Sequence, residues 1–434
     1  MQPWQWSAHA AATAMARGEL RSETLVASCL ERIALREPQL QAWAHLDAAA
    51  ALDQARARDR EPRRGPLHGI PIGVKDVIRT ADHPTTFNSP IYAGHRPNED
   101  AHAVAVLRAS GAVILGKTQT LEFACGGAFP PTRNPWDLER TPGGSSSGSG
   151  AAVADGMVPL ALGTQTGGST IRPAAFCGVH GMKPTWGRIP WDGAKGYSPA
   201  LDTVGLYGRS AADLRLMLQA YALAGGDDPP APGLGQLRLG VVRTPHWAEA
   251  ELQAQAAFER TLALLRQRGV HLAELDWPDG CEAINRWQDE VMQDGGRYAF
   301  VPERLSHPAL LHAEFKAKLD NHLGLTPQRM RDALDGIARC RMAFERSMEG
   351  LHGALGLSAP GVAPLGLHTQ GMATFNRMWT ALQVPCISLP ALWSDAGLPM
   401  GLQLIGRRYD DALLLAVAET LDGVLVDPGR RPWN

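Results

Sequence analysis

The chain has few cysteines, and they do not form the pattern of a metal site or a disulfide framework. The cysteines are Cys29, Cys125, Cys177, Cys281, Cys340 and Cys386. No two of them form a CxxC pair, and no HExxH motif is present, so neither a metal nor another cofactor is expected. Scattered cysteines in a chain of 434 residues are typical of reduced, mostly buried thiols. This pattern predicts a cytoplasmic protein.

Long apolar runs and an excess of one charge are also missing. No segment approaches the roughly 20 apolar residues that a membrane span needs, and the N-terminal residues lack the basic start and apolar core of a secretory signal. The 42 Lys and Arg residues nearly balance the 44 Asp and Glu residues, for a net charge of -2 at pH 7. We therefore expect neither a membrane nor a nucleic acid as a partner.

Strand and helix patterns alternate along most of the chain, which predicts an α/β fold. Ile70, Ile72 and Val74 alternate directly before Lys75, so a strand is expected to end at that lysine. Further strands are predicted at 112–115, 158–163, 237–242 and 398–406, and helices after Ser22 and at 48–60, 100–109, 151–155 and 413–421.

The chain is expected to form one domain over residues 1–434. Residues 225–235 are predicted to form a surface loop rather than a domain boundary, because the α/β alternation resumes after them. The charged segment from about 280 to 360 is helical in pattern. It is expected to be a variable region on the substrate side of the domain.

Two glycine- and serine-rich clusters, 143–150 and 167–169, are the most informative stretch of the sequence. Glycine lets the backbone approach a ligand closely, and serine supplies a hydroxyl that a base can convert into a nucleophile. Two such clusters separated by packed structure predict two walls of one catalytic site.

Three motifs compete in and near this stretch. Residues 111–118 match GxxxxGK[ST], but Ala112, Val113, Ile114 and Leu115 favour a buried strand over a phosphate-binding loop. Residues 144–148 match GxSxG, with Ser146 as nucleophile, but the preceding residues have loop character where that motif requires a strand.

The third interpretation is a serine–serine–lysine site. A lysine replaces histidine as a base when burial keeps its amine neutral, and Lys75 lies among apolar neighbours. The turn Thr166-Gly167-Gly168-Ser169 supplies successive backbone N–H groups for an oxyanion. Ser145 or a neighbour is then expected to relay the proton between Lys75 and Ser169.

The sequence resembles the amidase signature family. The stretch PGGSSSGSGAAVADGMVPLALGTQTGGSTIRPAAFCGVHGMKPTWGRIP resembles the defining segment of that family along its full length. Similar segments are GPLHGIPIGVKDVI upstream and VPCISLPALWSDAGLPMGLQLIG downstream. The resemblance covers most of residues 15–270 and 375–421 and fades between about 280 and 360. It implies a central mixed β-sheet covered by helices on both faces.

The resemblance also implies roles for individual residues. Ser169 matches the nucleophile, Lys75 the base, and Ser145 the bridging serine, which follows a cis peptide in the family. Ser146 is expected to orient Lys75, with Thr164 as a second supporting residue. The implied reaction is attack by Ser169 on an amide carbonyl, protonation of the leaving amine through Ser145, and hydrolysis of the acyl-enzyme.

Departures from the common pattern bear on the substrate. Gln165 stands where aspartate is common, and Arg172 follows Ser169 by three residues. This pattern is similar to the malonamidase-like, small-substrate branch, which implies that Arg172 meets a substrate carboxylate. A buried structural cation that fixes the turn is the alternative role for Arg172. Gln165 and Gly144 are the other expected substrate-binding residues.

The expected function is hydrolysis of a small carboxamide. The alternatives are the A subunit of a glutamyl- or aspartyl-tRNA amidotransferase, which passes ammonia to a mischarged tRNA within a complex, and a non-catalytic scaffold on the same fold. A homodimer is an open alternative to a monomer. The residues do not identify the amide.

Overall fold

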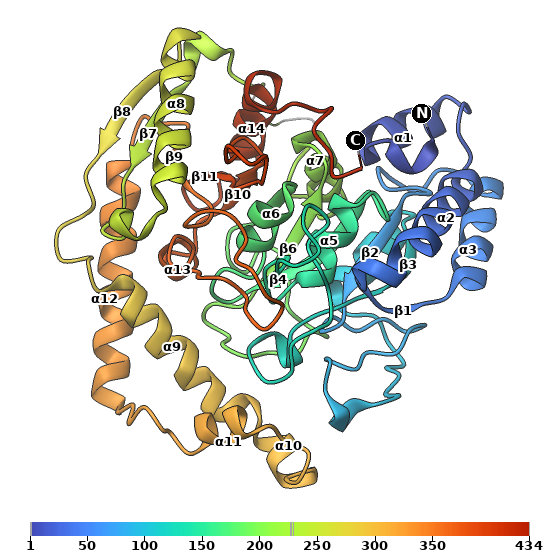
Figure 1. The fold of residues 1–434 in the computed structure, drawn as a ribbon, viewed down its shortest axis with the longest axis horizontal. Helices are drawn as coiled ribbons and strands as arrows, with labels where there is room; N and C mark the ends of the chain where they lie inside the picture. The colour runs from blue at the N-terminus through green and yellow to red at the C-terminus, as the bar shows by residue number, and fades with distance from the viewer. Residues whose placement is uncertain (1, 226–227, 229, 434) are drawn as a thin grey trace.

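An 11-stranded mixed sheet extends through the part of the molecule that the structure describes, with strand order β1-β3-β2-β4-β6-β5-β10-β11-β9-β7-β8 (Figure 1). The structure is a computed structural model that describes residues 2–225, 228 and 230–433. The strands are β1 (Trp43–Leu46), β2 (Pro71–Lys75), β3 (Val113–Thr118), β4 (Leu160–Gln165), β5 (His180–Lys183), β6 (Thr203–Gly208), β7 (Arg238–Val242), β8 (His271–Leu275), β9 (Gly353–Leu357), β10 (Cys386–Leu389) and β11 (Leu402–Ile405).

Helices connect these strands. They are α1 (Ala8–Ala16), α2 (Ser22–Leu40), α3 (Ala48–Arg60), α4 (His102–Ala109), α5 (Ser147–Ala154), α6 (Ile171–Cys177), α7 (Ala211–Ala220), α8 (Leu252–Gln267), α9 (Ile284–Ala299), α10 (Val301–Ser306), α11 (Ala313–Leu319), α12 (Pro327–Ser347), α13 (Arg377–Ala381) and α14 (Asp411–Leu425). Short 3-10 turns lie at Pro3–Gln5, Pro90–Tyr92, Glu122–Ala124, Leu234–Gln236 and Trp247–Glu249.

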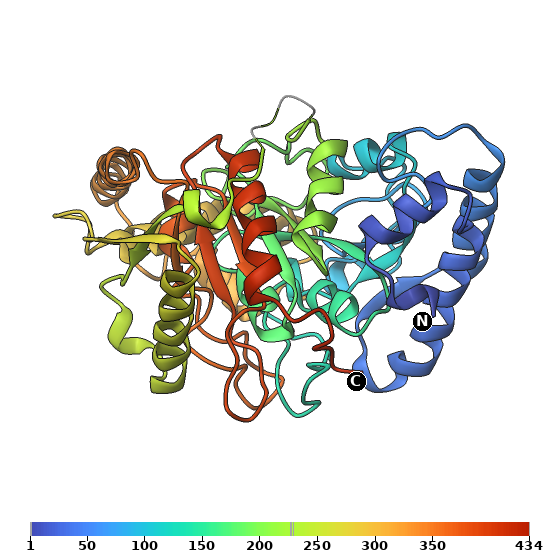
Figure 2. The same ribbon diagram turned by 90° about the horizontal axis from the view of Figure 1, so that it is seen from above.

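Helices cover both faces of the sheet (Figure 2). On β6, a Cβ at Gly205 would collide with Thr170, directly before α6, whereas a Cβ at Gly208 would collide with Asp213 in α7. Residues three apart on a strand point to opposite faces, so α6 and α7 cover different faces. This confirms the α/β fold with a mixed central sheet between helical layers.

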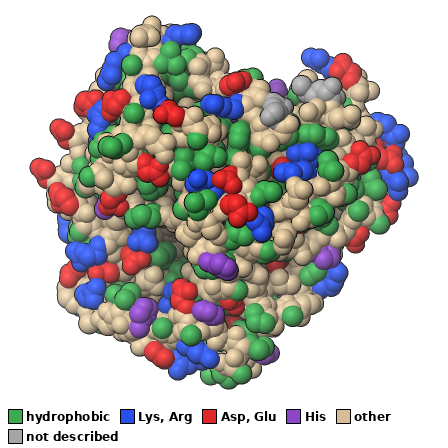
Figure 3. All heavy atoms as spheres, in the orientation of Figure 1, with side chains coloured by type: hydrophobic (Ala, Val, Ile, Leu, Met, Phe, Trp, Pro, Cys, Tyr) green, Lys and Arg blue, Asp and Glu red, His purple; other side chains and the backbone are tan. Residues whose placement is uncertain are grey.

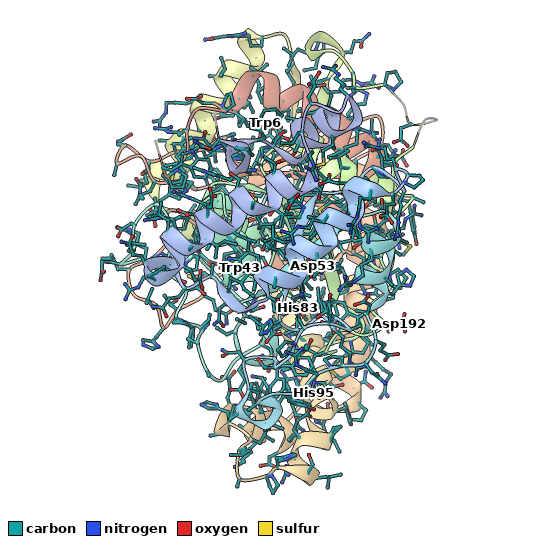
Figure 4. The ribbon with its side chains drawn as sticks, turned by 90° about the vertical axis from the view of Figure 1, so that its right-hand side faces the viewer. Trp6, Trp43, Asp53, His83, His95 and Asp192 are labelled. Carbon is teal, nitrogen blue, oxygen red and sulfur yellow. A yellow bond between two sulfur atoms is a disulfide. The ribbon has the colours of Figure 1, made fainter. Side chains whose placement is uncertain are left out.

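The right-hand side of the molecule is covered by the N-terminal helices. Figure 4 shows α2 and α3 on this side, with Trp43 labelled beside them. The Trp43 ring occupies the space that a side chain at Gly73 of β2 would need. The chain ends meet nearby (Figure 1), where the rings of Trp4 and Trp433 contact edge to face with centroids 5.2 Å apart.

The strand predicted to end at Lys75 is confirmed as β2, and the helix predicted at 48–60 is α3. Gly116, Lys117 and Thr118 lie within β3. An extended strand cannot curl its N–H groups around a phosphate, so the GxxxxGK[ST] match is not a phosphate-binding loop. The loop predicted at 225–235 lies partly outside the described residues.

The prediction that all six cysteines are reduced is wrong for two of them. Cys281, before α9, and Cys340, in α12, form a disulfide with a Cα–Cα distance of 5.6 Å. Cys29, Cys125, Cys177 and Cys386 are free thiols. The sequence separation of 59 residues hid this pair, because only the packing of α12 against α9 brings the two cysteines together.

The surface carries both charges intermixed on the face shown in Figure 3, without a continuous basic stripe. Among the residues described, no helix combines the length and the apolar character needed to cross a membrane.

Candidate active site

Lys75 lies at the C-terminal end of β2 and is completely buried. Its Nζ is 2.8 Å from Ser145 Oγ and 2.6 Å from Thr164 Oγ1. No carboxylate of the described residues forms an ion pair with it. Burial lowers the pKa of Lys75 well below its usual range, the charge of Asp202 opposes this shift, and the charge of Arg172 adds to it. This shift favours the neutral amine, which is the form that can accept a proton.

Ser145 and Ser146 precede α5 and have different partners. The Gly144–Ser145 peptide is cis, and the Ser145 hydroxyl faces Lys75. Ser146 Oγ donates to the Thr164 carbonyl and accepts from the Thr164 N–H, both at 3.2 Å. Ser146 therefore contacts the backbone of Thr164, the residue whose hydroxyl lies beside Lys75 Nζ. Since Ser146 is fully buried with its hydroxyl on the backbone of β4, the GxSxG interpretation has no accessible nucleophile.

Ser169 lies in the turn between β4 and α6 and is 8% exposed. Its Oγ has no hydrogen-bond partner among the described residues, and the residue lines a cavity. The backbone N–H groups of Gly167, Gly168 and Ser169 also lack an acceptor within that part of the chain. The carbonyls of this turn, in contrast, are occupied. Thr380 Oγ1 donates to the Gly167 carbonyl, and the backbone N–H of Arg172 donates to the Gly168 carbonyl. Within the described residues, the turn thus leaves these donors free beside the Ser169 hydroxyl, as an oxyanion site requires.

Asp202 supports this turn and was not found by sequence reasoning. Its Oδ1 accepts from Thr166 Oγ1 at 2.6 Å, and its Oδ2 accepts from the N–H groups of Tyr197 and Ser198. Burial raises the pKa of Asp202 to about 6, although these hydrogen bonds and the charge of Lys75 oppose the rise. The Thr166 hydroxyl therefore uses its one proton in the hydrogen bond to Asp202.

The cavity at Ser169 has a volume of about 200 Å³ and adjoins, through shared lining residues, a second cavity of about 680 Å³. Both cavities are lined by Arg172, Gln370, Ala373 and Arg377. Met292 and Gln293 of α9 and Glu314 and Lys318 of α11 form part of the inner wall. The helical segment that the sequence placed on the substrate side therefore contributes to this wall.

Gln165 and Gly144 do not face the cavity as substrate-binding residues would. Gln165 Oε1 accepts from the N–H groups of Thr170 and Ile171, and its Nε2 donates to Thr380. Its amide thus holds the start of α6. The Gly144 carbonyl accepts from Arg172, and Gln370 fills the space where a Gly144 side chain would lie.

Arg172 lines the cavity, but other parts of the protein already hold it. Its Nε and Nη2 donate to the Gly144 carbonyl, Nη1 donates to the Gly371 carbonyl, and Nη2 also donates to Gln370 Oε1. One of its five N–H groups is left free, whereas a bidentate carboxylate contact needs two. This arrangement favours the structural role over the carboxylate clamp. Arg172 also links α6 to the segment that carries Ser145.

Gln370, Arg377, Glu314 and Lys318 were missed because they lie where the resemblance is weak or far from the motifs. A polar or charged residue outside any motif carries no local signal. Only the packing of α9, α11 and α13 near the Ser169 turn brings these side chains into one cavity.

Known proteins resemble this chain over most of its length. The family model described as Amidase matches residues 24–331. The A subunit of a glutamyl-tRNA(Gln) amidotransferase from Chloroflexus aggregans is 36% identical over 98% of this chain and 97% of the relative. A protein of the same name from Anaeromyxobacter sp. is 34% identical over 95% of this chain and 94% of the relative. These curated relatives do not support the malonamidase-like branch.

Solved structures share the fold. One titled "Crystal structure of amidase" is 29% identical, with a TM-score of 0.87 over 97% of this chain and 100% of that chain. The native peptide amidase from Stenotrophomonas maltophilia is 27% identical, with a TM-score of 0.80 over 96% of both chains. With the family match, the sequence relatives and the shared fold, the chain belongs to the amidase family, whose signature its glycine- and serine-rich stretch carries.

Proposed function

We propose that the chain cleaves the C–N bond of an amide through an acyl intermediate on Ser169. The observation that carries this proposal is the buried Lys75 amine, which lies within hydrogen-bond distance of Ser145 and has no ion-pair partner among the described residues. The free Ser169 hydroxyl and the unused N–H groups of its turn support it. The same features argue against a non-catalytic scaffold, which has no need of a neutral buried lysine.

The proposed reaction begins with attack of Ser169 Oγ on the amide carbonyl carbon. The Ser169 proton passes to Ser145 Oγ as the Ser145 proton passes to Lys75 Nζ. The carbonyl oxygen becomes an oxyanion that the N–H groups of Gly167, Gly168 and Ser169 stabilise. The C–N bond then breaks, and the leaving nitrogen takes a proton from Ser145, which Lys75 replenishes.

Hydrolysis of the acyl-enzyme reverses this proton path. Water attacks the ester carbon and gives its proton through Ser145 to Lys75. The Ser169–acyl bond then breaks, and the proton returns to Ser169. A Ser145–Ser169 hydrogen bond is needed only once substrate is bound, since catalytic contacts often tighten in the complex.

The names of the curated relatives favour the amidotransferase alternative over a stand-alone amidase. In that function the chain is an A subunit, and the ammonia it releases goes to a tRNA-bound acyl group in a complex. The first chemical step is the same in both cases, and the inner cavity of about 200 Å³ fits a small amide in both.

A single assay separates these alternatives. Ammonia release from L-glutamine, succinamate and butyramide is measured with the purified chain alone, while a fluorophosphonate probe reports the reactivity of Ser169. Labelling of Ser169 with little turnover of any amide supports the A-subunit role. Rapid turnover by the chain alone supports the stand-alone amidase, and absence of labelling contradicts both.

A further inference from the structure

The proposed oxyanion donors belong to the turn of residues 166–169, here called the oxyanion turn. These donors are the N–H groups of Gly167, Gly168 and Ser169. Each N–H shares one planar peptide with the carbonyl of the residue before it, and the two groups point in opposite directions. The partner of that carbonyl therefore sets the direction of the N–H. The carbonyls that direct the three donors are those of Thr166, Gly167 and Gly168.

Two of these carbonyls are held by side chains from segments that are distant in the sequence. Gln288 Nε2 of α9 donates to the Thr166 carbonyl at 2.8 Å. Thr380 Oγ1 of α13 donates to the Gly167 carbonyl, also at 2.8 Å. The Gly168 carbonyl accepts from a backbone N–H of α6, the helix that begins directly after the turn. The first two donors of the oxyanion turn thus depend on side chains of α9 and α13.

Gln288 is completely buried and is the only donor to the Thr166 carbonyl among the described residues. Its Nε2 also lies 3.8 Å from Met292 Sδ, whereas its Oε1 has no hydrogen-bond partner in that part of the chain. An unpartnered amide oxygen is unfavourable in the interior. An apolar side chain of similar length would avoid this penalty but would leave the Thr166 carbonyl without a donor. The bond to the oxyanion turn therefore accounts for an amide at this position.

The helix that carries Gln288 is itself fixed on both sides of this residue. Asn285 Nδ2, one turn earlier, donates to the Thr374 carbonyl at 2.9 Å. The Val291 carbonyl, one turn later, accepts from Ser198 Oγ at 3.3 Å. Helix α9 also packs against α13, which carries the second side-chain donor (Figure 1). The Gln288 amide is thus presented to the turn from a fixed position.

We propose that Gln288 and Thr380 are positioning residues for the oxyanion site, each holding a peptide so that its N–H points at the oxygen that becomes negative during acylation. This inference rests on the proposed function. Neither side chain is among the described residues that line the inner cavity, so both act through the backbone of the turn. A hydrogen bond to the carbonyl also polarises the peptide and strengthens its N–H as a donor.

The effect of these residues belongs to the transition state. The negative oxygen forms only as Ser169 attacks, so a misdirected N–H slows acylation and leaves binding of the intact substrate nearly unchanged. A residue that merely supports the shape of the cavity would instead change binding and reaction together. Separate measurement of the two therefore distinguishes positioning from general support.

The test uses a fluorophosphonate probe, whose phosphonyl oxygen enters the oxyanion site as Ser169 attacks phosphorus. In Gln288→Met, the maximal rate of Ser169 labelling is expected to fall at least about fivefold, since outright removal of one oxyanion donor costs about 10²–10³-fold. The probe concentration that gives half of the maximal rate should change less than twofold. Thr380→Val, which removes the hydroxyl at similar size, is expected to show the same separation.

Gln255→Met is the matched control. Gln255 of α8 donates to the carbonyls of Trp247 and Ala250, so this variant also loses glutamine-to-backbone hydrogen bonds. Gln255 is not among the described residues that line either cavity. Its labelling constants should match those of the wild type.

Propylboronic acid provides a second readout, because its adduct with Ser169 is tetrahedral and places an oxygen in the oxyanion site. Its protection of Ser169 against the probe is expected to weaken at least about fivefold in Gln288→Met and to remain unchanged in Gln255→Met. Thermal unfolding of each variant monitors the fold.

Gln288→Glu keeps the length and shape of the side chain and serves if Gln288→Met does not fold. A protonated carboxyl can donate to the Thr166 carbonyl, whereas an ionised one cannot. The labelling rate of this variant relative to the wild type should therefore be lower at pH 9 than at pH 6. Equal relative rates at the two pH values would contradict the role of Gln288 as a donor.

A loss of less than fivefold in the maximal labelling rate of Gln288→Met, or a matching change in the half-saturating concentration, overturns the positioning role while the proposed function stands. The same criterion applies to Thr380→Val. Failure of the probe to label wild-type Ser169 overturns the proposed function and this inference with it.

Discussion

At the scale of single residues, the site depends on a lysine placed where a charge is unfavourable. Lys75 has hydroxyl partners from Ser145 and Thr164 but no carboxylate among the described residues. Desolvation of the ammonium form is therefore not offset by an ion pair. The unfavourable burial of a charge becomes useful because the neutral amine is the form that accepts a proton.

Ser169→Ala and Lys75→Ala are expected to reduce turnover by at least about 10³-fold, because each removes a member of a proton-relay unit. Ser169→Ala should leave the fold stable, since Ser169 Oγ makes no internal hydrogen bond among the described residues, whereas Lys75→Ala also removes a buried side chain with two hydrogen bonds and should lower the unfolding temperature. Ammonia release and thermal unfolding are the measurements, with Ser147→Ala as the matched serine control. Substantial activity in either variant contradicts the proposed roles.

The pH dependence of Ser169 acylation tests the state of Lys75. As the pH rises, the lysine loses its proton and becomes able to accept another, so the acylation rate should increase and then level off. Since burial lowers the pKa of Lys75 well below its usual range, the plateau should be reached well before the ordinary lysine pKa of about 10.4. The rate of fluorophosphonate labelling gives this profile without interference from product release. An increase confined to pH values above about 10 contradicts the neutral amine.

At the scale of elements, the ends of strands and the turns after them build the site. The proposed nucleophile Ser169 follows β4, the proposed base Lys75 ends β2, and the proposed relay Ser145 precedes α5. Asp202 joins the Thr166 turn to the loop at Tyr197 and Ser198, directly before β6. This single carboxylate therefore holds the shape of the turn that carries the oxyanion donors.

Asp202 should make stability depend on pH. Because its folded-state pKa of about 6 lies above the ordinary value of 3.8, the folded state binds the extra proton between these values. Its contribution is full below the unfolded-state pKa and is lost as pH rises through the folded-state pKa, a change of about 3 kcal/mol. Urea unfolding of wild type and Asp202→Asn at pH 4 to 7 measures the difference. Parallel stability curves for the two proteins would show that Asp202 does not titrate in this range.

At the scale of the whole molecule, one sheet joins segments from both ends of the chain. The N-terminal β1, β2 and β3 lie at one side of β4 and β6, and the later β7, β8 and β9 lie at the far end of the sheet. The helices α9 to α12 lie between β8 and β9 in the chain, and residues of α9 and α11 line the Ser169 cavity. The Cys281–Cys340 disulfide links the residues before α9, where this helical segment begins, to α12, where it ends.

Thiol titration tests the disulfide directly. Denatured, unreduced protein should show four reactive thiols, and reduction should raise the number to six. A Cys281→Ser/Cys340→Ser variant should lose about 4 kcal/mol of unfolding free energy, because the link closes a loop of 59 residues. Six reactive thiols before reduction would restore the expectation of reduced cysteines.

Local sequence patterns predicted much of this fold. Alternating apolar residues located β2 and its terminal lysine, amphipathic spacing of apolar residues located α2, and a segment rich in alanine and charge located α3. The strands β1, β5, β6, β8, β9 and β10 were missed, since strands of four to six residues carry little periodicity of their own. Their position in the sheet depends on pairing partners that are distant in sequence.

The sequence alone determined the fold class, the strand that ends at Lys75 and the two glycine- and serine-rich turns, because these features follow from local pattern and backbone chemistry. The tertiary structure alone determined the direction of each side chain. The Gln165 side chain accepts from the start of α6, the Arg172 guanidinium donates to backbone carbonyls, and Arg377 lines the cavity, although all three are polar residues near the site. Their roles differ because burial and competing hydrogen-bond partners, which arise only on packing, decide which donors stay free for a substrate.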